Sequence, residues 1–252
     1  MDLGLNGKRA LVLGSSQGIG AEIARVLARE GCNVYVGARR LDHIQSLADE
    51  LSEEFNVDAK AYPIDLSDGI SVEKLCEMIT HEWKIDILLN NAGGPPPSPS
   101  TGVPDEIWES SLQSLLMSTI RLSEAAVKGM RERGWGRILT VASSGVIQPI
   151  PNLAVSNTVR SAVVGFTKTL SNEVAKDGIT VNMVLPSIHK ASANKQGMTY
   201  EEFRDNSRSS IPARRFGTAK EFAEVAVFLM SVCASYITGS VIRVDGGVIQ
   251  SV

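Results

Sequence analysis

The amino-acid sequence predicts an α/β fold: one doubly wound, seven-stranded parallel sheet flanked by helices. Short apolar runs rich in Val and Ile alternate with longer segments of helical period, which is typical of repeated βαβ units. The first apolar run leads directly into a glycine-rich turn. Neither an interdomain linker nor an internal repeat interrupts the 252 residues, and a single α/β sheet accommodates that length. We therefore expect one domain over residues 1–252.

Seven apolar segments are predicted as the strands of this sheet, because their branched side chains suit strands that are buried on both faces. The predicted strands are Arg9–Leu13, Asn33–Gly37, Ala59–Ile64, Asp86–Leu89, Arg137–Ala142, Thr180–Leu185 and Val241–Val244. Near the C-terminus, Thr199-x-x-Glu202 and Thr218-x-x-Glu221 each have the spacing of a capping box and predict the start of a helix.

Composition narrows the possible partners. Lys and Arg number 25 against 28 Asp and Glu, so a net charge of −3 offers no broad positive field to nucleic acid or to an anionic membrane. No apolar segment approaches the length of a membrane span, and Ala10–Leu13 is too short for the core of a signal peptide. The three cysteines, Cys32, Cys76 and Cys233, lack the spacing of metal ligands and are expected to be small buried residues in a reducing compartment. We expect a cytoplasmic protein with neither a nucleic-acid nor a membrane partner and no metal.

The glycine-rich turn Gly14–Gly20 predicts a dinucleotide site. It follows an apolar strand and opens an amphipathic helix, which is the context that phosphate binding requires. The glycines let the backbone approach a pyrophosphate, and the helix N-terminus stabilises its negative charge. The alternative is a plain glycine-rich turn. The predicted cofactor contacts here are Gly14, Ser15, Ser16, Gly18, Ile19 and Gly20.

The residues after the second strand favour NADP(H). An NAD-binding unit usually has an acidic residue there, which accepts hydrogen bonds from the adenosine ribose. This sequence has Ala38, followed by Arg39 and Arg40. A guanidinium matches the oxygens of a 2′-phosphate, and no carboxylate repels that phosphate. The alternative is that both arginines are solvated residues at a helix start.

Two loops are predicted to form the walls of the site. Residues 93–104 contain five prolines, and residues 187–212 begin with a polar stretch. Each follows the carboxyl end of a predicted strand, where open α/β sheets bind ligands. The alternative is that both are surface loops.

Together with this turn, Asn90-Asn91-Ala92-Gly93 after the fourth strand and Ser143 after the fifth make the chain resemble the short-chain dehydrogenase/reductase family. The resemblance is strongest to its 3-oxoacyl-[acyl-carrier-protein] reductase branch and extends to Tyr236–Gly239 and Val244–Gly247. It implies a Rossmann-type fold, NADP(H), a carbonyl or acyl thioester substrate and a homotetramer. That tetramer would pair through the long helices around Ser143 and through the C-terminal apolar segment.

The resemblance also implies roles for further residues. In the family, Asp65 and Leu66 would flank the adenine, and the backbone of Asn91, Ala92 and Gly93 would line the adenosine ribose. Pro186 and the residues after it, including His189, would hold the nicotinamide amide, and Arg160 would hold the nicotinamide ribose as the family's lysine does.

The catalytic set departs from the family pattern of Asn, Ser, Tyr and Lys. Only Ser143 is kept: counting from it places Ser156 at the tyrosine position and Arg160 at the lysine position, with Ser114 at the asparagine position. A serine hydroxyl is a far weaker acid than a phenol. The candidate catalytic residues are therefore Ser143, Ser156 and Arg160, with a bound water as the expected source of the proton.

Two hypotheses remain open from the sequence. One is an NADP(H)-dependent reductase of a ketone or 3-oxoacyl group with an altered catalytic centre. In that case His189 or Tyr200 is an alternative proton donor, if the loop that carries them folds inward. The other is a non-catalytic relative that binds the nucleotide as a scaffold or sensor.

Overall fold

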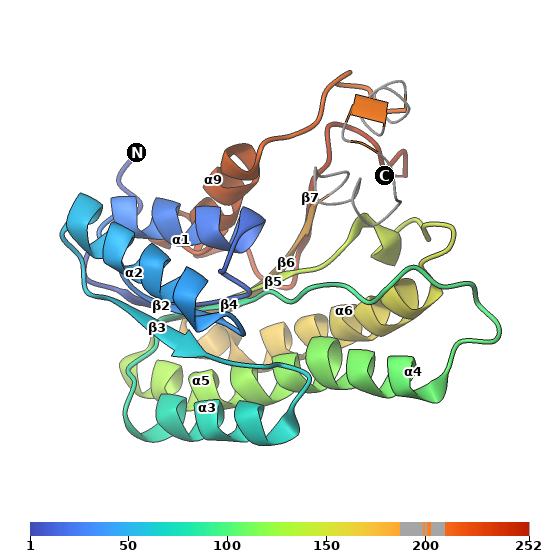
Figure 1. The fold of residues 1–252 in the computed structure, drawn as a ribbon. Coiled ribbons are helices and arrows are strands. Elements are labelled where there is room, and N and C mark those ends of the chain that lie inside the picture. The colour runs from blue at the N-terminus through green and yellow to red at the C-terminus, as the bar shows by residue number, and fades with distance from the viewer. Residues whose placement is uncertain (187–198, 200, 203–209, 252) are drawn as a thin grey trace.

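The computed structural model describes residues 1–186, 199, 201–202 and 210–251. These residues contain seven parallel strands in one sheet, in the order β3-β2-β1-β4-β5-β6-β7 (Figure 1). The strands are β1 Arg9–Leu13, β2 Asn33–Ala38, β3 Ala59–Pro63, β4 Ile87–Asn90, β5 Gly136–Val141, β6 Ile179–Pro186 and β7 Val241–Val244. Every predicted strand agrees with these bounds to within one residue at each end. The predicted single-domain fold class is confirmed.

Helices cover both faces of the sheet because the strands are apolar on both sides. In β1, Ala10 and Val12 face one layer of the core, and Leu11 and Leu13 face the other. Helices α1, α2 and α9 lie on the first face, and α3, α5 and α6 lie on the second (Figure 1). The helices are α1 Gly18–Arg29, α2 Leu41–Phe55, α3 Gly69–His81, α4 Asp105–Ser111, α5 Ser118–Arg133, α6 Ala154–Val174 and α9 Ala219–Leu229. A short π-helix, Leu112–Met117, joins α4 to α5.

The order of the strands places a ligand site at one edge of the sheet. Strand β1 pairs with β2 on one side and with β4 on the other, so the direction of winding reverses beside it. Loops leave the two halves of such a sheet in opposite directions at this point and open a crevice at the carboxyl ends of the strands. The glycine-rich turn after β1 and the segment after β4 both begin there.

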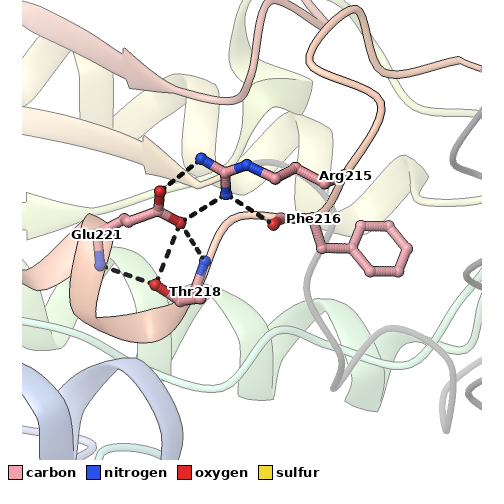
Figure 2. A network of polar contacts seen from close by, with 4 residues as sticks. All are labelled: Arg215, Phe216, Thr218 and Glu221. Atoms are coloured by element: carbon pink, nitrogen blue, oxygen red, sulfur yellow. Dashed lines mark hydrogen bonds and ion pairs between the residues drawn. The ribbon is translucent and has the colours of Figure 1, made fainter.

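Helix α9 begins at a capping box, as predicted. Thr218 accepts a hydrogen bond from the backbone N–H of Glu221, whose carboxylate accepts one from the backbone N–H of Thr218 (Figure 2). Arg215 donates to both carboxylate oxygens of Glu221, at 2.9 and 2.6 Å. The bonds from Arg215 and then from Thr218 lower the pKa of Glu221 to about 2. The other predicted box also forms, because Glu202 accepts hydrogen bonds from the N–H and hydroxyl of Thr199.

The cysteine prediction is only partly correct. Cys32 is fully buried, and burial raises the pKa of its thiol to about 12. Cys76 is partly buried, but Cys233 is exposed, because it lies in a short turn after α9 rather than against the sheet. Within the described residues, no helix has both the length and the apolar composition that crossing a bilayer requires.

Candidate functional site

The glycine-rich turn between β1 and α1 has a backbone that only glycine suits. Gly14 and Gly18 have φ angles of +60° and +65°, in the left-handed region. A Cβ on Gly14 would lie 2.6 Å from the carbonyl oxygen of Asn91, and one on Gly20 would lie 2.3 Å from the carbonyl oxygen of Gly14. Helix α1 begins at Gly18 without a side-chain cap. Its first N–H groups therefore remain available to an anion such as a pyrophosphate.

Two side chains hold this turn in place. The backbone N–H and the hydroxyl of Ser15 both donate to the carbonyl of Gly37 in β2, each at 3.3 Å, and Ser15 is fully buried. The side-chain amide of Asn91 donates to the carbonyls of Leu13 and Gly14, each at 3.2 Å. These bonds fix the turn to the ends of β2 and β4.

The two arginines after β2 have different surroundings. Arg40 donates to the side-chain oxygen of Gln17 at 3.1 Å and to the hydroxyl of Ser16 at 3.5 Å, so its guanidinium lies over the glycine-rich turn. Arg39 lies near Asp65 at the end of β3 and exerts an electrostatic effect on it. Arg39 and Arg40 were both predicted to contact a phosphate. Of the two, Arg40 is the one that lies against the glycine-rich turn.

The surroundings of Asp65 favour its ionised form. Partial burial opposes its ionisation, but two hydrogen bonds from Ser67 and the positive charge of Arg39 outweigh that effect and lower the pKa of the carboxyl. The two bonds from Ser67 measure 2.9 and 2.7 Å. Leu66, the other predicted adenine contact, is partly buried beside it.

Ser143 lies two residues after the end of β5, at the same edge of the sheet. Its hydroxyl accepts a hydrogen bond from the backbone N–H of Gly145 at 3.2 Å and caps a short 3₁₀ turn. The hydroxyl hydrogen remains free to be donated to another group. Ser143 is partly exposed, as a residue that contacts a ligand must be.

Ser156 and Arg160 share one face of α6, and both are buried, with 7% and 8% of their surface exposed. The guanidinium of Arg160 donates to the carbonyl of Val141 at 3.0 Å and to that of Ala92 at 3.3 Å. It therefore links the ends of β5 and β4. Burial lowers the pKa of Arg160 to about 10, so it remains a cation at neutral pH. None of its contacts with described residues is to a carboxylate.

A small cavity adjoins Arg160 behind the ends of β4 and β5. It measures about 10 Å³, which is room for about one water molecule. Ser114, from the π-helix, and Asn90 are among the residues that line it. The side-chain oxygen of Asn90 is buried and has no hydrogen-bond donor among the described residues, while its amide donates to Ser123 at 3.2 Å.

The structure brings most of the predicted site residues to one edge of the sheet. Ala92 and Gly93 follow β4, and Pro186 is the last residue of β6. His189, Tyr200 and most of the predicted loop 187–212 lie outside the described residues.

Sequence reasoning did not find Gln17 as a partner of Arg40, or the link from Ser98 to the segment before α6. Of these two contacts, only that of Ser98 could have been expected from the sequence, because Ser98 is the one residue with a backbone N–H in a run of prolines.

The chain is similar to characterised proteins over nearly its whole length. A family model described as enoyl-(acyl carrier protein) reductase matches residues 14–249. The 3-oxoacyl-[acyl-carrier-protein] reductase of Vibrio cholerae is 35% identical over 248 residues, which cover 97% of this chain and 98% of that protein. The reductase of the same name from Escherichia coli is 34% identical, with the same shares covered.

Solved structures are also similar to this chain over its whole length. The L-sorbose reductase of Gluconobacter frateurii, complexed with NADPH and L-sorbose, superimposes with a TM-score of 0.92 at 33% identity, with 100% of each chain covered. A putative NAD(P)-dependent gluconate 5-dehydrogenase from Beutenbergia cavernae, with bound NADP, gives the same TM-score, identity and coverage.

Proposed function

Because the chain belongs to the short-chain dehydrogenase/reductase family, we propose that it is an NADP(H)-dependent oxidoreductase that reduces a ketone or 3-oxoacyl group at an altered catalytic centre. The observation that carries this proposal is the intact phosphate end of the site beside Ser143. The glycine-rich turn has free amides at the start of α1, and its conformation is held by Ser15 and Asn91.

The choice of NADP(H) follows from Ala38 and Arg40. No carboxylate occupies the end of β2, and the guanidinium of Arg40 already lies beside Ser16 and Gln17. A 2′-phosphate at this position would meet a fork of donors and no carboxylate from the end of β2. The L-sorbose reductase from Gluconobacter and the putative gluconate 5-dehydrogenase from Beutenbergia, which hold NADPH and NADP, support the same choice.

The chemistry needs groups that stabilise negative charge on the carbonyl oxygen. NADPH, when bound, supplies the hydride. Ser143 has a free hydroxyl hydrogen to donate to that oxygen, and Arg160 keeps the surroundings positive from behind the ends of β4 and β5. With a pKa of about 10, Arg160 does not release a proton at neutral pH. Ser156 is too weak an acid to replace a phenol, so we assign the proton to a bound water.

The burial of Ser156 and Arg160 supports a second candidate function. Ser156 and Arg160 are over nine-tenths buried, and Arg160 uses two of its donors on backbone carbonyls. A protein that binds the nucleotide without turnover, as a scaffold or sensor, needs only such a bracing role. The two functions differ in one measurable property, the oxidation of NADPH.

The test is spectrophotometric. Purified protein is mixed with NADPH and a panel of ketones and 3-oxoacyl thioesters, and the absorbance of NADPH is followed. We expect oxidation that depends on the carbonyl compound and falls in a Ser143→Ala variant. NADPH binding by calorimetry with no oxidation for any compound would favour the non-catalytic function.

We also propose that residues 93–104 and 187–212 form the walls of the substrate site and that the protein assembles as a homotetramer in the cytoplasm. The long helices α5 and α6 support the tetramer, because α3, α5 and α6 border a hollow on the outer side of the molecule. Arg121 and Phe166 are among the residues that line it, so the hollow offers both charge and an apolar side chain to a second copy.

A further inference from the structure

The loop after β4 contains a run of prolines with one exception. In Pro95–Pro99 only Ser98 has a backbone N–H, because proline has none. Ser98 is 5% exposed, whereas Pro97 and Pro99 on either side of it are exposed. A buried N–H requires an acceptor, so the single donor of this run has a defined partner.

That partner is the segment that leads into α6. The N–H of Ser98 donates to the carbonyl of Asn152 at 2.9 Å, and the carbonyl of Ser98 accepts from the N–H of Ala154 at 3.1 Å. Together these bonds form an isolated parallel bridge between Ser98 and Leu153. Ala154 is the first residue of α6 and lies two residues before Ser156. The proline run is therefore joined to the helix that carries the altered catalytic pair.

The loop is also held at its other end by the same helix. Arg160 donates to the carbonyl of Ala92, which lies at the start of the loop. The two points of attachment on α6, Ala154 and Arg160, are about 9 Å apart along a helix. Residues 92–98, which we call the arch, can span about 20 Å when extended and are fixed at both ends by these bonds. The prolines stiffen the arch, because they restrict the backbone to extended conformations.

We propose that Ser98 is a positioning residue that fixes this arch as a rigid wall of the substrate site, through its backbone rather than its side chain. The proposal rests on the proposed reductase function, because it assigns the wall to the substrate of that reaction. It predicts that loss of the Ser98 N–H weakens substrate binding and leaves cofactor binding unchanged, because Ala92, at the cofactor end of the arch, stays bonded to Arg160. Gly14 to Gly20, which hold the predicted phosphate site, contact neither Ser98 nor the segment before α6 in any hydrogen bond among described residues.

The side chain of Ser98 provides a control. Its hydroxyl is buried and has no hydrogen-bond partner among the described residues. Ser98→Ala removes this hydroxyl and keeps the N–H, whereas Ser98→Pro removes the N–H. Ser100→Pro adds a proline to the same loop at an exposed residue outside the bridge.

The experiment compares these three variants with the parent. Hydrogen exchange measured by mass spectrometry on the peptide that contains Ala154 should become at least fivefold faster in Ser98→Pro and stay at the parental rate in the other two. With a carbonyl compound that the parent reduces, KM should rise about fivefold in Ser98→Pro, equivalent to one net hydrogen bond of about 1 kcal/mol. The Kd for NADPH should stay within twofold in all variants.

The outcomes separate the two proposals. If the parent oxidises no NADPH, the reductase function fails, and the exchange data still decide whether Ser98 holds the arch. Unchanged exchange in a folded Ser98→Pro would overturn the proposal. Faster exchange with an unchanged KM would also overturn it, because the bridge would then be structural only. If Ser98→Pro does not fold, the Ser98→Ala variant decides the question. A raised KM in Ser98→Ala would show that the side chain acts, contrary to the proposal. A parental KM in Ser98→Ala, with the N–H of Ala154 still protected from exchange, would support the proposal.

Discussion

Replacing Ser156 by Tyr together with Arg160 by Lys should increase carbonyl reduction. The phenol supplies a proton donor whose pKa the neighbouring ammonium lowers toward neutrality. General acid catalysis contributes a factor of about 10²–10⁴ in rate. We expect the lower end, about 10²-fold, because Ser114 remains at the position that the sequence predicts for the family's asparagine.

The same replacement should lower stability. Ser156 is 7% exposed, and the adjacent cavity has only about 10 Å³, so the ring overpacks the site at a cost of about 1–3 kcal/mol. Lysine also loses at least one of the two bonds from Arg160 to the carbonyls of Val141 and Ala92, which costs about 1.5–3 kcal/mol. The total of about 2.5–6 kcal/mol corresponds to a fall in Tm of about 5–25 °C for a domain of this size.

The assay is NADPH oxidation with the best ketone of the panel, run beside thermal melting and NADPH calorimetry. The matched control is Ser156→Phe with Arg160→Lys, which has the same bulk and no phenol hydroxyl. We expect the tyrosine variant to exceed both parent and control in kcat, with NADPH affinity within a few-fold of the parent. A folded tyrosine variant that binds NADPH but reduces no faster than the phenylalanine control would refute the reasoning, because the missing phenol would then not limit the rate.

Four further predictions concern the cofactor, helix α9 and the assembly. NADPH should bind at least tenfold more tightly than NADH, a difference of about 1.4 kcal/mol, and Arg40→Ala should abolish that preference in calorimetry more completely than Arg39→Ala; equal effects would contradict the placement of Arg40 over the turn. Thr218→Ala should cost about 1 kcal/mol in chemical unfolding by removing the cap of α9. Glu221, whose pKa is lowered to about 2 from 4.5, stabilises the fold above pH 4.5, so the Tm difference between parent and Glu221→Gln should vanish as pH falls from 4.5 toward 2; a constant difference would show that the carboxylate charge is not involved. Light scattering at micromolar concentration should give the mass of four chains, and a monomer would end the tetramer proposal.

The sheet could be predicted because the pattern that indicates each strand lies within a few consecutive residues. Strands such as Arg9–Leu13 and Val241–Val244 are short apolar runs between turns and helices, and their bounds match the prediction. The glycine-rich turn could be predicted equally well, because Gly14 and Gly18 have positive φ angles, which glycine adopts more easily than other residues. The capping box at Thr218 depends only on a spacing of three residues.

The contacts of Arg160 could not be predicted in the same way, because they join distant parts of the chain. Arg160 contacts carbonyls that are 19 and 68 residues away, and no periodicity connects those positions. The sequence placed Arg39 and Arg40 together, but which one lies over the turn depends on the direction in which each side chain leaves the end of β2. The proline run indicated that Ser98 needs an acceptor without indicating that Asn152 supplies it.

The central claim is that this site transfers hydride to a carbonyl carbon in spite of its missing phenol. The most direct measurement uses NADPH carrying deuterium at the transferable position of the nicotinamide, incubated with the protein and the panel of ketones and 3-oxoacyl thioesters. Mass spectrometry should find an alcohol product that is heavier by one deuterium at the former carbonyl carbon, and Ser143→Ala should reduce its yield. Tight NADPH binding with no deuterated alcohol from any compound would contradict the claim.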